Sequence, residues 1–289
     1  MNFGVKPITI NLNKEYRQSL SALKKIVNVQ NDIMNYDNKN LVVDLSSTEF
    51  ISPAYLPVIA SLPLIKQNRI VLKYNKNSKL HQILEKQGVI EYYKKNNYVK
   101  GNENKVIPFT KIVSQDDLVN VINKILDLAP IVMSEDARCV LFSKFYEMFI
   151  NATTHGANEI GAFCSGKWDF NRQSLIISVY DYGIGITKNV NNYLKKYNKI
   201  NTDLNCREAF DWALTKGNST KETDFPRGTG LNVLEDFVNK NGGKITLCSG
   251  NGIYVLENGT KKFENMENSI LGTLMIINIR ADNEHIYVV

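Results

Sequence analysis

The alternation of short apolar strands with helices constrains the fold of this 289-residue chain more than any other feature. Apolar segments at 41–45 and 69–74 predict strands, and helix-start signals follow them at Ser52-Pro53 and Ser78. A strand–helix–strand–helix order at this spacing indicates parallel strands joined by crossover helices. Hydrophobic residues make up 43% and charged residues 22% of the chain, a globular composition that excludes disordered and fibrous classes.

The second part of the chain has a different pattern, with helices first and strands after them. A polar stretch at 97–108 predicts a boundary, which divides the chain into domains at 1–108 and 109–289. Helices are predicted at 115–128, 134–154 and 230–241, helical or irregular structure at 187–226, and strands at 160–170, 174–180, 244–248, 253–257 and 271–279. Turn signals at Asn251-Gly252 and Asn258-Gly259 are predicted to end the first two of the three late strands.

The net charge and the composition limit the kinds of ligand and partner that we expect for this chain. Lysine and arginine number 35 against 29 acidic residues, and the net charge of +6 favours anionic ligands such as nucleotides. Basic residues are spread along the chain, which argues against a dedicated nucleic-acid surface. No run of about 18 apolar residues predicts a membrane span. The first residues lack an export signal, so we expect a cytoplasmic protein with reduced cysteines. The cysteines and histidines do not have the spacing of a zinc site.

A carboxylate and an amide share one face of the helix predicted at 134–154. Glu147 and Asn151 are four residues apart, so they lie one helical turn from each other. Beside an apolar stripe, such a pair is costly to bury unless it meets water, a metal or a ligand. An exposed polar helix face is the alternative interpretation.

Two glycines follow an aspartate at the end of the strand predicted at 174–180. In Asp181-Tyr182-Gly183-Ile184-Gly185, the glycines let the backbone turn and approach a flat ligand closely. The Asp181 carboxylate can accept a hydrogen bond from an exocyclic amine such as that of adenine. A plain β-turn is the alternative interpretation.

A third motif, Pro226-Arg227-Gly228-Thr229-Gly230-Leu231, directly precedes the helix predicted at 230–241. Backbone N–H groups at a helix start suit phosphate. The preceding segment, from Lys216 to Lys221, offers flexible backbone and two cations, which suits a mobile lid over a triphosphate. Neither the Rossmann nor the Walker spacing fits, and a glycine-rich loop without a ligand is the alternative.

The order of these motifs carries more information than any one of them. A helix with E-x-x-x-N, a strand ending in D-x-G-x-G, a lysine-containing lid, G-T-G-L before a helix and a late strand with Gly272-Thr273 follow one another. Over about residues 115–280, the chain therefore resembles the GHKL superfamily of ATP-binding domains. Asn151-Ala152-Thr153-Thr154-His155-Gly156 is most similar to the version found in anti-sigma-factor kinases.

This resemblance implies ATP and Mg²⁺ as cofactors and a role for each matching residue. Asn151 would be the protein ligand of Mg²⁺, and Glu147 would be the base that activates water or a hydroxyl nucleophile. Asp181 would bind the adenine amino group, supported by Thr273. The other residues would surround the nucleotide: Gly183 and Gly185 along it, Gly228, Thr229, Gly230 and Leu231 at the phosphates, and Lys216 or Lys221 at the γ-phosphate when the lid closes.

The first part, at about residues 5–100, resembles a STAS domain, the fold of anti-sigma antagonists. The stretch from Val42 to Leu56 carries this resemblance, as a strand followed by a helix start. In the family, that helix start carries an acid and a phosphorylatable Ser or Thr followed by Gly. Here Ser52 stands in place of the acid and Pro53-Ala54-Tyr55 follows, which argues against a phosphorylation switch at this point.

Together the two resemblances imply an α/β protein, in which a STAS-like α/β domain precedes a Bergerat-type α/β sandwich. The sandwich would have a mixed sheet covered by helices on one face. Three functions remain open. The first is a nucleotide-controlled switch with slow ATP hydrolysis, whose state is read by the STAS-like half or by a partner protein. The second is a protein serine/threonine kinase of the anti-sigma type. The third is an interaction module that binds nucleotide with little turnover. Homodimerisation is common in the superfamily, but no interface stands out in the sequence.

Overall fold

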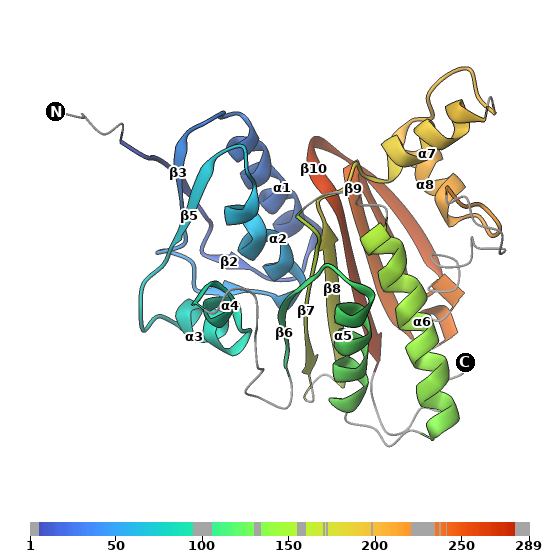
Figure 1. The fold of residues 1–289 in the computed structure, drawn as a ribbon, viewed down its shortest axis with the longest axis horizontal. Helices are drawn as coiled ribbons and strands as arrows, with labels where there is room; N and C mark the ends of the chain where they lie inside the picture. Colours follow the sequence, from blue (N-terminus) through green and yellow to red (C-terminus); the bar gives the residue numbers. More distant parts are fainter. Residues whose placement is uncertain are drawn as a thin grey trace.

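A computed structural model of the protein describes residues 6–94, 106–129, 134–154, 160–169, 171, 173–197, 199–220, 235–236, 238–240 and 242–280. At positions 137, 148 and 151–154 it describes the backbone alone. The described chain forms a three-stranded sheet, a five-stranded sheet and a small two-stranded sheet, with helices between and beside the two larger ones (Figure 1). The α/β fold class predicted from the sequence is confirmed. None of the described helices combines the length and apolarity needed to cross a bilayer.

The first half of the chain folds around a small parallel sheet. Strands β1 (Ile8–Asn11), β3 (Asn40–Asp44) and β5 (Arg69–Lys73) pair in parallel in the order β1-β3-β5. The predicted parallel pairing is therefore confirmed. The other elements are β2 (Glu15–Tyr16), α1 (Leu20–Met34), β4 (Phe50–Ile51), the 3-10 turns η1 (Pro53–Tyr55) and η2 (Leu62–Leu64) on either side of α2 (Leu56–Ser61), α3 (Lys79–Lys86) and α4 (Val89–Lys94).

Serine side chains begin the main helical segments of this half. The hydroxyls of Ser19, Ser52 and Ser78 each accept a hydrogen bond from a backbone N–H two or three residues further on, at the starts of α1, η1 and α3. The helix starts predicted at Ser52 and Ser78 are confirmed. Helix α1 has the same kind of cap, but it is not among the elements predicted above.

The second half folds around a five-stranded sheet in the order β6-β7-β8-β10-β9. Every pair of described strands in it is antiparallel, so the expected mixed sheet is a wrong prediction. Two of these pairs, β7–β8 and β9–β10, are hairpins, which can only be antiparallel. The elements are β6 (Val106–Ile112), α5 (Gln115–Asp127), α6 (Glu135–Thr154), β7 (Ala162–Asp169), β8 (Ser174–Asp181), α7 (Ile186–Lys196), α8 (Cys206–Leu214), β9 (Gly243–Glu257) and β10 (Thr260–Arg280).

The end of the chain forms one long hairpin where three separate strands are predicted. Strands β9 and β10 pair around Asn258-Gly259, where both residues have positive φ. The predicted turn at Asn251-Gly252 is wrong, because both residues lie within β9. A Cβ at position 252 would lie 2.5 Å from Sγ of Cys206, so this glycine marks the close approach of α8.

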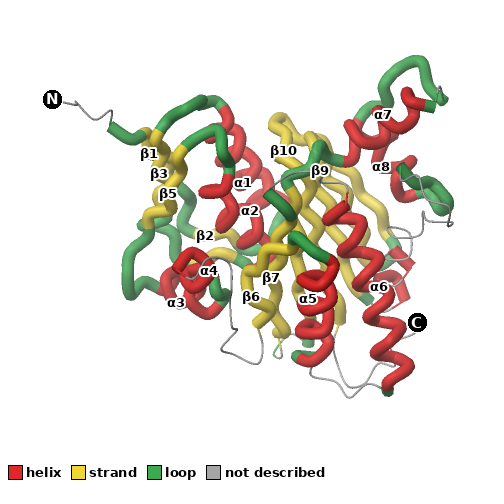
Figure 2. Tube along the Cα trace, in the orientation of Figure 1, coloured by secondary structure: helices red, strands yellow, loops and turns green. Residues whose placement is uncertain are grey.

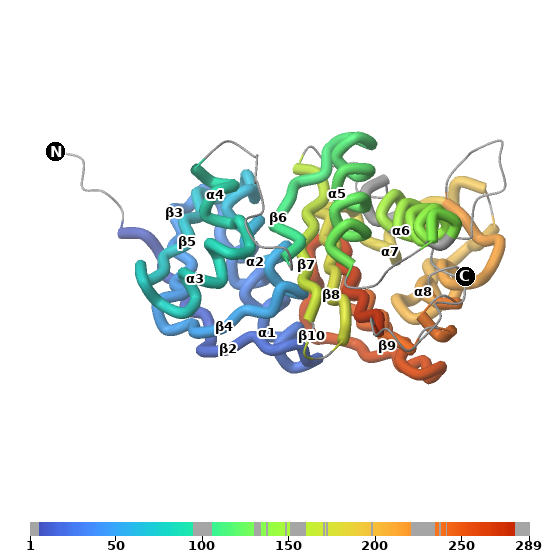
Figure 3. Tube along the Cα trace, turned by 90° about the horizontal axis from the view of Figure 1, so that it is seen from below, coloured from blue at the N-terminus to red at the C-terminus, as the bar shows by residue number. Residues whose placement is uncertain are grey.

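Helices cover both faces of the five-stranded sheet. Helices α5 and α6 lie on one face, and α1 and α2 of the first half lie on the other (Figures 1 and 3). In Figure 2 these two helices stand between the small and the large sheet. The side chains of β8 alternate accordingly: Ile177 and Val179 join the core under α5 and α6, whereas Ile176 and Tyr180 join the core of the first half. The expectation of helices on one face is therefore incomplete, and the second face is the surface on which the two halves share a core.

Candidate functional site

Asp181, at the end of β8, is an unusual polar residue within the described part of the chain, because its carboxyl group is almost fully buried. The alternation along β8 places its side chain on the face covered by α5 and α6, and only 3% of the residue is exposed. Its Oδ1 accepts a hydrogen bond of 2.6 Å from the backbone N–H of Gly183. Its Oδ2 is buried and has no hydrogen-bond partner among the residues that the structure describes. A buried acceptor of this kind is rare and needs an explanation.

The protonation of Asp181 follows from this environment. Burial raises the pKa of the carboxyl to about 7, although the Gly183 N–H acts in the opposite direction by stabilising the carboxylate. The charged form is therefore disfavoured until a donor meets the free oxygen. Strongly raised pKa values of this kind cluster at functional sites.

Thr273 of β10 is the ladder partner of Asp181, so the structure brings these two predicted site residues together. The hydroxyl of Thr273 lies 3.1 Å from that of Ser249 in β9. Ser249 also accepts a hydrogen bond of 2.8 Å from the N–H of Ile186, the first residue of α7. Ser249 thus joins β9 and β10 to the start of α7, directly after the loop of Gly183 and Gly185. The sequence analysis missed it, although a serine within an apolar strand is a signal.

Gly272 allows the close contact between β8 and β10. Its φ is +87°, and a Cβ there would lie 1.9 Å from the carbonyl oxygen of Asp181. No other residue type fits that space. This glycine lies where the β9–β10 ladder changes register, between Ile270 and Thr273. The bulge therefore brings the backbone of β10 directly against the end of β8.

Helix α6 carries the predicted pair Glu147 and Asn151 across the same face of the sheet. It packs on β8 through a buried side that includes Phe145 and Phe149. Glu147 is half-buried, and Asn151 follows it by four residues on the helix, where the backbone alone is described. The structure thus packs the predicted helix against the strand that ends in Asp181.

The predicted lid is described only in part. Lys216 follows α8 and is exposed. The end of the described lid lies against α7, because Nδ2 of Asn189 donates a hydrogen bond of 3.0 Å to Oγ1 of Thr220. The remaining predicted site residues lie outside the described residues: Lys221, Gly228, Thr229, Gly230 and Leu231.

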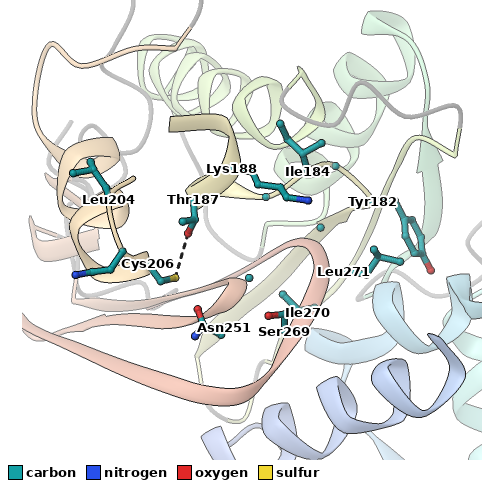
Figure 4. A pocket seen from close by; sticks show the side chains of 15 residues that line it. Tyr182, Ile184, Thr187, Lys188, Leu204, Cys206, Asn251, Ser269, Ile270 and Leu271 are labelled. Atoms are coloured by element: carbon teal, nitrogen blue, oxygen red, sulfur yellow. Dashed lines mark hydrogen bonds between the residues drawn. The ribbon is translucent and has the colours of Figure 1, made fainter. Parts of the chain in front are cut away.

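A pocket of about 620 Å³ opens along the loop of Gly183 and Gly185 (Figure 4). The start of α7, the start of α8 at Cys206 and the β10 bulge at 269–272 form its walls. Inside it, Oγ1 of Thr187 donates a hydrogen bond of 3.3 Å to Sγ of Cys206. Asp181 and Thr273 do not line this pocket, although the glycine loop that follows Asp181 does.

The comparisons with known proteins do not define a family for this chain. No family model matches it, and no curated protein matches it. Among solved structures, the topoisomerase IV ATP-binding domain of Francisella tularensis, in complex with a small molecule inhibitor, matches at 18% identity and a TM-score of 0.23. The match covers 41% of this chain and 31% of that one. So small a match carries no argument, and the function is argued from the geometry of the site.

Proposed function

We propose that this chain binds ATP with Mg²⁺ on the α6 face of its five-stranded sheet and acts as a nucleotide-controlled switch of GHKL type with slow hydrolysis. The observation that carries the proposal is the buried Oδ2 of Asp181, for which the described part of the chain supplies no hydrogen-bond donor. An exocyclic amino group such as that of adenine supplies the N–H donor that this oxygen lacks. Binding would then give this buried oxygen a charge-assisted hydrogen bond, which removes the free-energy cost of burying it without a donor.

The neighbours of Asp181 suit an adenine ring. Thr273, its ladder partner, offers a hydroxyl beside it, and Gly183 and Gly185 carry no side chain that would keep a flat ligand from the backbone. Glu147 and Asn151 of α6 would reach the triphosphate end, Asn151 as the Mg²⁺ ligand and Glu147 as the base. Lys216, Lys221 and the motif Gly228-Thr229-Gly230-Leu231 would contact the phosphates.

A magnesium site of this kind needs few protein ligands. Mg²⁺ keeps several waters and is bound through phosphates and one or two protein oxygens. Among the residues that the structure describes, no three His, Cys, Asp or Glu side chains gather to hold a metal on their own. In this proposal the metal arrives with the nucleotide and Asn151 is its protein ligand. Mg²⁺ would neutralise the phosphate charge during transfer to water.

The position of the first half favours a switch over a kinase acting on its own STAS-like part. Ser52 is 4% exposed. The carbonyl of Pro53 next to it accepts hydrogen bonds from Ser165 and Ser178, at 2.7 and 3.0 Å, so this helix start is docked on the second sheet. A hydroxyl at that place has no access to a γ-phosphate. The proposal includes a STAS-like domain at residues 1–108, which reads the nucleotide state itself or together with a partner protein. It also allows a homodimer. Phosphotransfer to a separate protein is an alternative function.

Thermal unfolding tests nucleotide binding directly. We expect ATP with Mg²⁺ to raise the melting temperature of the wild type more than GTP with Mg²⁺, because only adenine carries an amino group at the carbon that faces Asp181. Asp181→Asn keeps the contact to Gly183 but turns an amide N–H₂ toward the ligand, so the shift with ATP should vanish. A wild type that is unmoved by ATP, or an equal shift in the variant, would show that the site is wrongly assigned.

Turnover separates the alternatives. Glu147→Ala should still be stabilised by ATP with Mg²⁺ but should lose at least about 100-fold in hydrolysis, since a general base contributes that much. Asn151→Ala should lose the dependence on Mg²⁺. With labelled ATP, free phosphate supports the switch, label on a partner protein supports the kinase, and binding without either product supports the interaction module.

A further inference from the structure

We propose that Gln30, in α1 of the first half, is a positioning residue for the nucleotide site, because it holds the strands that carry Asp181 and Thr273 in register. The proposal rests on the proposed function for its effect on affinity. It deepens that function by assigning to the first half a specific contact with the site.

Gln30 closes a small buried network between the two halves. The residue is 1% exposed. Its Nε2 donates a hydrogen bond of 2.8 Å to the hydroxyl of Tyr180, and its Oε1 accepts one of 3.2 Å from the N–H of Leu271. The Tyr180 hydroxyl in turn donates to the carbonyl of Leu271. One amide side chain and one phenol thus satisfy both backbone groups of Leu271.

Those backbone groups need partners because the ladder is interrupted at this point. The β9–β10 pairing shifts register between Ile270 and Thr273, and Leu271 has no ladder partner in β9. A bulge leaves such groups unpaired unless side chains reach them. Gln30 and Tyr180 supply those contacts from across the sheet. The bulge is therefore completed by the first half of the chain.

The network is also adjacent to the proposed nucleotide contacts. Tyr180 directly precedes Asp181 in β8, and Leu271 lies two residues before Thr273 in β10. Gly272, between them, packs against the carbonyl of Asp181. A shift of Leu271 must therefore move Gly272 and the Asp181–Thr273 pair. Through Gln30, the position of α1 becomes coupled to the geometry that receives adenine.

Asn31 of α1 also reaches the bulge, since its Nδ2 donates a hydrogen bond of 2.8 Å to the carbonyl of Ser269. Two other contacts of α1 with β10 lie away from the bulge. Lys24 pairs with Glu264, and Asn28 accepts a hydrogen bond from Asn268 at 3.0 Å. These contacts lie on exposed surface, and they serve as controls. Ile26, buried in the same helix, offers a control for loss of packing alone.

The test uses the full chain with Gln30→Met, which keeps the length of the side chain but removes both hydrogen bonds. Asn28→Ala and Ile26→Val are the matched controls. We expect amide hydrogen exchange in the ligand-free protein to become faster at 180–183 and 269–273 in Gln30→Met alone. By calorimetry, we expect its Kd for ATP with Mg²⁺ to rise about tenfold, as loss of one buried hydrogen bond predicts, and both controls to bind like the wild type.

The outcomes distinguish this inference from the proposed function. If the wild type binds ATP and Gln30→Met binds it equally well, the role of Gln30 is overturned and the proposed function stands. If Ile26→Val weakens binding as much as Gln30→Met, the effect is general packing, and the inference also falls. If the wild type does not bind ATP, the proposed function fails; exchange rates like those of the wild type in Gln30→Met then overturn the positioning role as well.

Discussion

At the scale of single residues, Asp181 is the residue on which the proposed adenine contact depends. Of its two oxygens, one accepts a hydrogen bond from the N–H of Gly183, and the other is buried with no partner within the described ranges of the chain. Such a group lowers stability when no ligand is present, which is typical of residues retained for function. Serine and threonine hydroxyls at 249 and 273 supply the polar surroundings of the same strand ends. The chemistry that fits this arrangement is a neutral or weakly basic amino donor on a flat ring.

The raised pKa of Asp181 predicts a pH dependence of stability. In the folded state the pKa is about 7, above its ordinary value of 3.8, so the folded state binds the proton more tightly. The contribution of this group to stability is therefore fully present below about pH 3.8 and is lost as the pH rises through about 7. Relative to the wild type, Asp181→Asn should gain on the order of 3 kcal/mol between pH 4 and pH 8.

Urea unfolding of both proteins, without nucleotide, at several pH values between 4 and 8 measures this difference. The comparison removes the titration of all other groups, because they are the same in both chains. A difference in unfolding free energy that does not change with pH would mean that Asp181 is solvated and titrates normally.

At the scale of elements, the β10 bulge is the feature that assembles the site. It brings Gly272 against the carbonyl of Asp181 and leaves Leu271 to be paired by side chains of β8 and α1. The long hairpin of β9 and β10 is continuous on both sides of this irregularity. The bulge therefore places one segment of β10 against the end of β8 without ending the strand.

Two glycines with nearly the same backbone conformation provide a test of that role. Gly272 and Gly217 have φ of +87° and +89°, but a Cβ at 217 would meet nothing within 4 Å. Gly217→Ala should cost about 1–2 kcal/mol of unfolding free energy from backbone strain alone. Gly272→Ala adds a clash with Asp181 and should cost more than about 3 kcal/mol.

Denaturant unfolding followed by circular dichroism gives both values. If the two alanine variants lose equal stability, the contact between β10 and the end of β8 is looser than 1.9 Å implies. If Gly272→Ala is as stable as the wild type, the bulge does not have the conformation described.

At the scale of the whole molecule, the two halves form one structure. Helices α1 and α2 belong by sequence to the first sheet, yet they also cover the second one, and buried residues of both halves form one continuous core. Hydrogen bonds from Ser165 and Ser178 to the carbonyl of Pro53 add polar contacts within this interface. A change in either half is therefore expected to be felt in the other.

Unfolding should accordingly be a single cooperative transition. Both tryptophans, Trp168 and Trp212, lie in the second half, so their fluorescence reports that half alone. Val43→Ala removes buried side-chain volume from β3 in the first half and should cost about 2 kcal/mol. Its midpoint measured by tryptophan fluorescence should fall as far as that measured by circular dichroism. A fluorescence midpoint equal to that of the wild type would show that the halves unfold separately.

The sequence by itself determined the features that depend on near neighbours in the chain. Serine caps, hydrophobic alternation and the Asn258-Gly259 turn identified most of the helices and strands, because these signals act over a few residues. The same local patterns singled out Asp181 and Gly183 as candidates, whereas Thr273 was predicted from the resemblance to the GHKL superfamily. The turn signal at Asn251-Gly252 gave a wrong prediction because Gly252 does not make a turn. It allows a close contact with Cys206, which is distant in sequence.

Only the tertiary structure decided which surfaces meet. The cover of the second sheet by α1 and α2, the antiparallel order of its strands, and the network of Gln30, Tyr180 and Leu271 all join residues far apart in the chain. The unpartnered oxygen of Asp181 is likewise a property of its surroundings, since it results from which groups pack around the end of β8 and which do not. Burial and hydrogen bonding depend on packing between distant segments, and no local pattern specifies that packing.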